Sequence, residues 1–232
     1  MIRDIKITDF HAHILPGADH GSSGTDVTRR QLALMNNAGV DTVVATPHFY
    51  PNRHTLEYFL DKVALSAEEF TSIDIQRPRL CIGAEVLYCE GLENLENIDR
   101  LCIRGTNILL LELPLDPWDQ WVLYTVDKLL KKYTVMLAHI DRYITRQAPE
   151  IEQLLDMGAL AQINASSLFY FSEKKHLSPF IERGMISAIG SDLHEVNKKT
   201  YKHFSSVEKK LGDEYLKIME RSQELLKDAE KI

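Results

Sequence analysis

Short apolar runs alternate with amphipathic segments along the chain, and this alternation constrains the fold more than any other feature. Residues 108–111 read Ile-Leu-Leu-Leu, a continuous apolar run that is typical of a parallel strand covered on both faces. Residues 55–70 instead carry a helical stripe with Leu56, Phe59 and Val63 on one side. Seven strand–helix units can be counted, with strands expected at 7–13, 40–46, 80–87, 107–113, 134–138, 160–164 and 185–190.

The repeated units predict a closed parallel α/β barrel, because buried parallel strands must be covered by the helices that connect them. No linker or shift in composition divides the 232 residues, so we expect a single domain over residues 1–232. Helices are expected from Thr25 or Asp26 to Gly39, over 55–70 and 118–132, from Pro149 to Gly158, near 177–183 and from Ser205 onward.

Composition excludes several classes of protein. A formal charge of −7 disfavours a nucleic-acid-binding protein, including a DNA exonuclease or editing domain. No apolar run approaches the roughly 18 residues that span a bilayer, so no membrane insertion is expected. The first residues lack the apolar core of a signal peptide, and Cys81, Cys89 and Cys102 form no Cys-x-x-Cys pair. We therefore expect a cytoplasmic protein with reduced cysteines.

Histidines and acids recur where the expected strands end. His11 and His13 lie two residues apart, so in a strand their imidazoles point to the same side. Imidazole is a common ligand of divalent transition metals. The later strands end in six further residues of this kind: His48, Glu85, Glu112, His139, Asp192 and His194. Because the carboxyl ends of parallel strands meet at one face of a barrel, these eight side chains are expected to converge there.

Each of these residues has a purely structural explanation when it is taken alone. Glu112 could pair with an arginine, His139 could be a hydrogen-bonded core histidine, and Asp192 could cap the following helix. Coincidence at six strand ends is a poorer explanation than a shared site. Eight ligands exceed the four that one zinc ion requires, so the pattern favours two or three divalent metal ions with bridging carboxylates.

The motifs at these strand ends resemble those of the PHP (polymerase and histidinol phosphatase) superfamily: His11-x-His13, Thr46-Pro47-His48, Gly83-Ala84-Glu85, Leu111-Glu112, Ala138-His139-Ile140-Asp141-Arg142 and Ser191-Asp192-x-His194. Their order and spacing are most similar to bacterial PHP-type protein-tyrosine phosphatases of capsule and exopolysaccharide operons. The resemblance runs from about residue 8 to 200. It implies a distorted seven-stranded (β/α)7 TIM-like barrel with a trinuclear site of Mn, Fe or Zn. It also implies hydrolysis of phosphotyrosine on proteins, typically on the tyrosine-rich tail of a bacterial tyrosine kinase.

Carried over by position, the resemblance implies a ligand set for each of three metals: His11, His13, Glu85 and Asp192; Glu85, Glu112 and His139; and His48, His194 and residue 20. At residue 20 the chain departs from the family, which usually has an acid-acid-Gly turn where this chain reads Asp19-His20-Gly21. His20 can still coordinate a metal, but it is neutral where aspartate would be anionic. Asp19 could substitute from the neighbouring position.

The expected reaction is in-line attack on phosphorus by a metal-activated hydroxide. A site with three divalent ions, three carboxylates and hydroxide is neutralised by a dianionic phosphate ester, which favours such esters over neutral substrates. Arg142, three residues after His139, is expected to grip the phosphate, and its structural alternative is an ion pair with Asp141. Lys199 is a second candidate for this role.

Two alternatives to the tyrosine phosphatase stay open. The first is a small-molecule phosphatase of the same superfamily, such as histidinol-phosphate phosphatase, which the expected metal ligands do not distinguish. The chain length and the Ala-His-Ile-Asp-Arg sequence favour the tyrosine phosphatase. The second is a metal-stabilised, non-catalytic regulatory homologue, for which His20 is the only support. The oligomeric state is left open.

Overall fold

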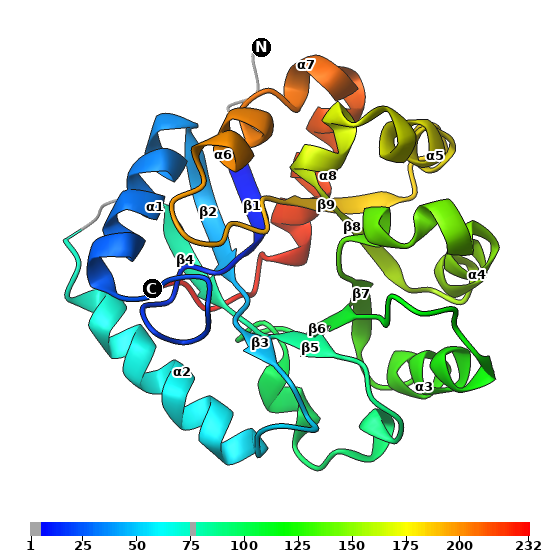
Figure 1. Cartoon of the computed structure of the whole chain (residues 1–232), viewed down its shortest axis with the longest axis horizontal. Coiled ribbons are helices and arrows are strands. Elements are labelled where there is room, and N and C mark those ends of the chain that lie inside the picture. The colour runs from blue at the N-terminus through cyan, green and yellow to red at the C-terminus, as the bar shows by residue number, and fades with distance from the viewer. Residues whose placement is uncertain (1–5, 75–77) are drawn as a thin grey trace.

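Parallel strands occupy the middle of the molecule, and helices α1 to α5 lie outside them (Figure 1). The structure is a computed structural model that describes residues 6–74 and 78–232. Within these residues the strands are β1 (Ile7–Ala12), β2 (Val40–Ala45), β3 (His48–Phe49), β4 (Arg79–Ile82), β5 (Glu85–Leu87), β6 (Ile108–Glu112), β7 (Thr134–Leu137), β8 (Leu160–Asn164) and β9 (Ile186–Gly190).

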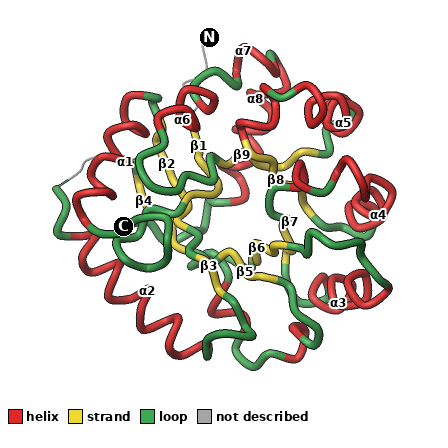
Figure 2. The backbone as a smooth tube through the Cα atoms, in the orientation of Figure 1, coloured by secondary structure: helices red, strands yellow, loops and turns green. Residues whose placement is uncertain are grey.

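The helices connect these strands, so that helix and strand alternate as the sequence predicts (Figure 2). They are α1 (Thr25–Asn37), α2 (Leu56–Thr71), α3 (Gln120–Leu130), α4 (Ile144–Asp156), α5 (Phe171–Glu182), α6 (Lys198–Phe204), α7 (Glu208–Leu211) and α8 (Asp213–Leu225). Short 3-10 helices span Leu92–Asn94, Ile98–Leu101, Ile140–Arg142 and Ala165–Phe169. None of the described helices is long and apolar enough to cross a membrane.

The strands form two parallel sheets, β1–β2–β4 and β3–β5–β6–β7–β8–β9, rather than one. In the described part of the chain, one isolated parallel bridge joins Ala12, at the end of β1, to Leu193, which follows β9. The predicted number of seven strands is wrong, because the structure has nine in the described residues.

The strand expected at 80–87 is divided in two, an additional short strand follows the one expected at 40–46, and the two breaks lie side by side. Pro47 has no N–H to give to a ladder, so it separates β2 from β3. Its carbonyl accepts a hydrogen bond from Glu85 N at 3.1 Å, while Gly83 N donates to Ala45 O at 2.9 Å. A Cβ on Gly83 would lie 3.0 Å from Ile103 Cγ1, so this break between β4 and β5 suits glycine.

Several helix boundaries also differ from the predictions. Helix α4 begins at Ile144 rather than at Pro149, and the non-helical Gln147 (φ −131°, ψ 30°) interrupts it just before the proline. Helix α5 begins at Phe171, earlier than expected. No side chain caps α1, whose N-cap residue is Gly24. Gly212, with φ 54°, divides the C-terminal helical segment into α7 and α8.

The buried apolar residues form two clusters. The larger one includes residues of the helices, such as Leu32, Phe59 and Leu154, and therefore lies between sheets and helices. The smaller one, which we call the inner cluster, takes its members mainly from the opposite side of the strands: Phe10, Val44, Cys81, Ile103, Ile108, Leu110, Met136, Ala138, Ala188, Leu226 and Ala229. The segment after α8 thus packs against this inner side of the sheets.

Candidate metal centre

Eight of the nine predicted metal ligands come together at the ends of the strands. His11 lies in β1 and His13 follows it. His48 comes after the end of β2, and Glu85 comes after the end of β4. The remaining four end or follow three later strands: Glu112 at β6, His139 at β7, and Asp192 and His194 at β9. Their nitrogen and oxygen atoms form four groups in which all ligand atoms lie within 4.8 Å of one another: His13, His48 and His194; His11, His13 and Asp192; His11, Glu85 and His139; and His48, Glu85 and Glu112.

Glu85 is the centre of this cluster. Its side chain is 1% exposed, yet four imidazoles approach its two carboxylate oxygens. His139 Nε2 lies 2.6 Å from Oε1, and His48 Nδ1 lies 2.9 Å from Oε2. Burial opposes ionisation of Glu85, but the neighbouring imidazoles, His11 first among them, hold its pKa well below the usual value. Glu85 is therefore an anion within reach of several groups at once.

The hydrogen bonds fix which nitrogens of His11 and His13 face the centre. Gln162 Oε1 accepts a hydrogen bond from the His139 backbone N–H at 2.6 Å, which identifies it as the oxygen, and it lies 3.2 Å from His11 Nδ1. His11 therefore carries its proton on Nδ1. Asp19 Oδ2 lies 2.6 Å from His13 Nδ1 and has the same effect there.

Although burial opposes protonation, the neighbouring carboxylates raise the pKa of both imidazoles, so the cluster attracts positive charge. With both Nδ1 atoms engaged, the Nε2 atoms of the two rings face each other. They are only 3.1 Å apart, and both lie 3.3 Å from the anionic Glu85 Oε2. Such an arrangement is repulsive unless a proton or a cation lies among these atoms. A metal ion fits it, because hydrogen bonding of Nδ1 to a carboxylate or carbonyl oxygen is the usual way in which a metal-binding imidazole is oriented.

Buried polar atoms without a hydrogen-bond partner also indicate that a cation belongs in the cluster. Among the described residues, His48 Nδ1, Glu85 Oε2 and Asp192 Oδ1 are buried and make no hydrogen bond of acceptable geometry. His48 Nδ1 and Glu85 Oε2 are 2.9 Å apart and so are close in space, but they are not aligned as donor and acceptor. Buried groups of this kind normally find a partner, and all three are ligand atoms in metal proteins. The residues present therefore fit a metal centre.

Asp19 and His20 lie differently with respect to the cluster. Asp19 accepts hydrogen bonds from Gly21 N at 2.8 Å and from His48 N at 3.0 Å in addition to His13. His20 belongs to none of the four ligand groups found in the described residues. Its ring stacks on those of His48 and His194, with centroids 4.9 and 4.6 Å away. Asp19 thus orients His13, while His20 lies beside the cluster.

Arg142 spans two carboxylates of the cluster. Its Nη1 lies 3.3 Å from Glu112 Oε1, and its Nη2 donates to Asp192 Oδ2. The alternative partner, Asp141, instead accepts a hydrogen bond from Asn164 N at 2.8 Å, and burial raises its pKa to about 7. The guanidinium is partly exposed, so it bridges Glu112 and Asp192 at the solvent side of the cluster.

Lys199 is not brought to the cluster. Its Nζ lies 3.5 Å from Tyr170 Oη and 5.7 Å from the centre of the Tyr170 ring. Lys199 is exposed, and helix α6, on which it lies, begins with the Asn197 side chain as its cap. The contacts of Lys199 therefore associate it with an exposed tyrosine and not with the metal ligands.

Some residues of the site carry no signal in the sequence. Gln162 orients His11 and also accepts from His139 N, and Asn164 Nδ2 donates to Asp192 Oδ2 at 2.9 Å. Both lie in β8 two residues apart, so they share a side of that strand. In the sequence, the only sign of their role is the polar–apolar–polar order Gln162-Ile163-Asn164. Polar residues at a strand end are too common for this order to identify a site.

Parallel sheets with histidines and carboxylates gathered at the strand ends define an α/β protein with a candidate polynuclear metal centre. The family model described as "Capsular polysaccharide synthesis, CpsB/CapC" matches residues 7–227, and the chain belongs to this family.

Two curated relatives support this membership. The chain is 26% identical over 209 residues to tyrosine-protein phosphatase CpsB of Streptococcus pneumoniae, covering 82% of this chain and 84% of that protein. It is 26% identical over 236 residues to tyrosine-protein phosphatase YwqE of Bacillus subtilis, covering 94% of this chain and 90% of that protein.

Solved structures show the same fold. The crystal structures of YwqE and CpsB, described as unique metal-dependent tyrosine phosphatases, match with a TM-score of 0.77 and 23% identity, covering 97% of this chain and 96% of the other. The histidinol phosphate phosphatase of Lactococcus lactis, complexed with zinc, L-histidinol and phosphate, matches with a TM-score of 0.52 and 17% identity, covering 89% and 94%. The fold is therefore shared by phosphatases that act on different substrates.

Proposed function

We propose that this chain is a metal-dependent phosphatase that hydrolyses phosphotyrosine on proteins. The observation that carries the proposal is the buried cluster around Glu85, in which the Nε2 atoms of two imidazoles face each other beside a carboxylate. The names of its curated relatives, both tyrosine-protein phosphatases, supply the substrate class. The finer proposal is that the substrate is the tyrosine-rich tail of a bacterial tyrosine kinase in the cytoplasm, which controls capsular or exopolysaccharide synthesis.

Two or three divalent ions of Mn, Fe or Zn would be held by the clustered side chains. Glu85 is shared between two of the four groups, so it is the natural bridging carboxylate. His48 and His194 would hold the ion nearest to His20, with Nε2 atoms 3.4 Å apart. Bound there, divalent ions activate water near neutral pH and neutralise charge on a phosphoryl group.

Arg142 would bind the phosphate. In the structure its positive charge pairs with the carboxylates of Glu112 and Asp192. Bound divalent ions would balance the negative charge of the same two carboxylates. Once ions take over that charge, the guanidinium keeps five N–H donors in a fixed fork at the exposed side of the cluster. A dianionic phosphoryl group offers the oxygens that match this fork, so the role of Arg142 is to orient the ester.

A cavity beside the cluster fits the aromatic part of such a substrate. It measures about 200 Å³ and is lined by His20, His48, Tyr50 and Tyr58 among others. Tyr50 stacks on His48 with ring centroids 5.2 Å apart, and the Arg53 guanidinium lies 5.0 Å from the Tyr50 ring. Rings favour offset stacking on other rings, so a phosphotyrosine side chain would pack against Tyr50 with its phosphate toward His48.

We also propose that the two sheets constitute one distorted barrel and that the chain is one domain. β3 continues the path of β2 beyond Pro47, and β5 continues that of β4 beyond Ala84, which reduces the nine strands of the described residues to seven positions. The bridge between Ala12 and Leu193 supports closure between β1 and the end of β9.

The test is hydrolysis of a phosphotyrosine peptide, with metal analysis of the same sample. Wild-type protein should bind two to three ions per chain and release phosphate. Glu112→Gln should lose metal together with activity. Arg142→Ala should keep its metal but lose roughly 10²-fold in kcat/KM, because a charge-assisted contact to the phosphoryl group is removed.

Arg146→Ala is the matched control, since Arg146 is an exposed arginine four residues further along that is outside the cluster. It should leave activity unchanged. Hydrolysis of histidinol phosphate with no turnover of the peptide would replace the proposed substrate. A folded protein that binds no metal would refute the metal centre.

A further inference from the structure

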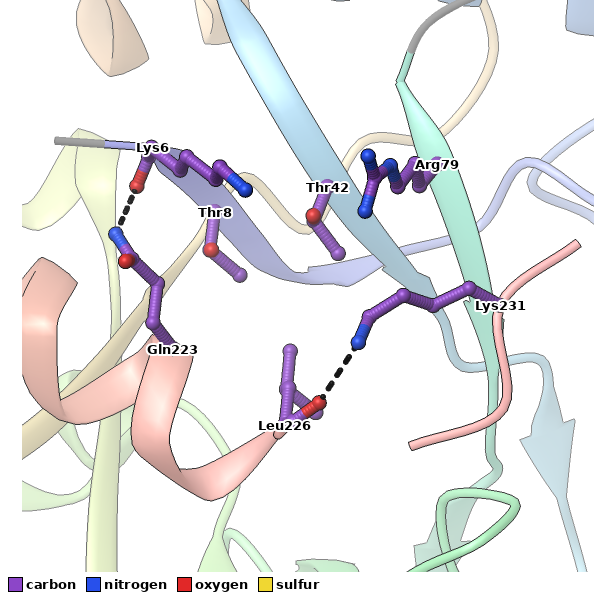
Figure 3. Close-up of a pocket in the computed structure, with 7 residues that line it drawn as sticks. All are labelled: Lys6, Thr8, Thr42, Arg79, Gln223, Leu226 and Lys231. Atoms are coloured by element: carbon purple, nitrogen blue, oxygen red, sulfur yellow. Dashed lines mark hydrogen bonds between the residues drawn. The ribbon is translucent and has the colours of Figure 1, made fainter. Parts of the chain in front are cut away.

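A second polar cavity lies at the other ends of the strands. It measures about 130 Å³ and is formed by the first residues of β1, β2 and β4 together with the end of α8 and the segment after it. The predicted metal ligands lie at the carboxyl ends of the same strands, so the two sites are at opposite ends of the sheet. Figure 3 shows the side chains that line this second cavity.

Three neighbouring strands contribute one row of residues to the cavity. Thr8 pairs with Thr42, and Thr42 pairs with Arg79, so all three lie at the same level of the sheet. Two residues further along each strand come Phe10, Val44 and Cys81, which are all members of the inner cluster. Because side chains alternate along a strand, the row faces the same inner side.

Two threonine hydroxyls in this row are available to a ligand in the cavity. Thr8 is 1% exposed and Thr42 is 8% exposed, and both line the cavity. Within residues 6–74 and 78–232, neither side chain makes a hydrogen bond, while Thr8 N donates to Met219 Sδ. Neither hydroxyl belongs to the buried, unpartnered side-chain atoms of the described residues, so both are open to the cavity and can donate to a ligand that enters it.

Three cations surround the two hydroxyls. Lys6, Arg79 and Lys231 line the cavity with them, and in Figure 3 the Lys231 amine is directed toward Leu226. Lys231 Nζ is held by Leu226 O at 3.2 Å, and the Gln223 side chain donates to Lys6 O at 2.6 Å.

No acid balances this charge within the cavity. None of the residues that line it is an Asp or a Glu, although the whole chain carries a formal charge of −7. Asp41, the neighbour of Thr42 in β2, accepts a hydrogen bond from Ile7 N at 3.0 Å and does not line the cavity. The electrostatic potential in the cavity is therefore positive, and an anion would be attracted to it.

We propose that this cavity is a binding site for a phosphate-type oxyanion. The space corresponds to about four water molecules at roughly 30 Å³ each, which suits a tetrahedral anion. Arg79 offers two parallel N–H groups, the lysines offer charge, and the threonine hydroxyls donate from the floor. The ligand is either free phosphate or the phosphate end of a small phosphorylated molecule. The site does not depend on the function proposed above.

The experiment titrates the full-length, metal-loaded protein with inorganic phosphate and, separately, with methylphosphonate, which a phosphatase cannot hydrolyse. Backbone amide resonances of Thr8, Thr42 and Arg79 report this site apart from the metal centre. We expect saturable shifts at these three residues. Arg79→Gln should weaken the binding about tenfold, since a charge-assisted contact is lost. Lys227→Gln is the control, because Lys227 pairs with Glu224 and lies outside the cavity.

Thr42→Val separates binding from folding. Valine keeps the shape but removes the unpartnered hydroxyl, so this variant should bind phosphate more weakly and yet be at least as stable as the wild type. If only inorganic phosphate saturates the shifts, the ligand is the free ion. If methylphosphonate saturates them too, the site also accepts a phosphate that carries one organic group, as in a monoester. The proposal is overturned if the three amides do not shift, or if Arg79→Gln and the wild type bind equally. Binding only to vesicles that contain phosphatidic acid would also overturn it.

Discussion

At the scale of single residues, the metal centre depends on side chains that touch the ligands rather than on the ligands alone. Gln162 has one oxygen that serves both His11 Nδ1 and His139 N, and its Nε2 donates to Ile163 O at 2.7 Å. One amide from β8 therefore fixes the imidazole of His11 in β1 and the backbone of His139 in the turn after β7. Such partners commonly matter to a metal site nearly as much as the ligands do.

Gln162→Leu should weaken metal binding by about 10- to 100-fold, because His11 is then free to carry its proton on Nε2. Competition with a fluorescent chelator measures this. Gln162→Glu keeps an acceptor oxygen at the same position and should retain more affinity than the leucine variant. Equal affinity in Gln162→Leu and the wild type would show that Gln162 does not position the imidazole.

At the scale of elements, the site requires β9 and β1 to approach each other unusually closely. A Cβ on Gly190, the last residue of β9, would lie 2.5 Å from His11 Cβ and 2.8 Å from Gln162 Nε2. Gly21 is similar, since a Cβ there would lie 2.0 Å from His13 Cβ. His139 and Asp192 have φ of 33° and 52°, a backbone conformation that is uncommon for residues other than glycine and that often marks functional sites.

Gly190→Ala should therefore force β9 away from β1, lowering stability by about 1–3 kcal/mol. For a chain of this size that corresponds to a fall in Tm of roughly 2–12 °C, with weaker metal binding in the same variant. Calorimetry measures the first effect. Gly24→Ser is the control, because a Cβ at Gly24 meets nothing within 4 Å and serine suits the start of α1. A wild-type Tm in Gly190→Ala would contradict the close approach.

At the scale of the whole molecule, the metal centre joins segments that are distant in sequence. Glu85, Glu112 and Asp192 come from three different strand ends, and the permanently charged Arg142 contacts Glu112 and Asp192. Ions that bind only the folded chain would neutralise these carboxylates and hold the two sheets together. Metal content should thus be coupled to global stability.

Removal of metal with a chelator should lower Tm. An ion at 100 times its Kd stabilises the folded state by about 2.7 kcal/mol, which corresponds to roughly 5–10 °C for a chain of this length. Thermal denaturation with EDTA, and after adding back Mn, Fe or Zn, measures the shift and ranks the ions. Glu112→Gln should show a smaller shift than the wild type. The same Tm with and without metal would mean that the ions do not link the segments.

The sequence by itself determined the alternation of strands and helices and the kinds of side chain at the strand ends. Both are local properties: the period of apolar residues sets the element, and a strand end sets which side a residue faces. The eight converging residues were predicted in this way, and their assembly in space agrees with that prediction.

The tertiary structure alone decided the rest, because it depends on contacts between distant segments. It placed the strand break at Gly83, paired Arg142 with Glu112 and Asp192, and brought Asp19 into contact with His13. It also put Thr8, Thr42 and Arg79 in one row beneath Lys231. No local pattern reports which strand lies beside which, or at what register, and a cavity exists only once that packing is set.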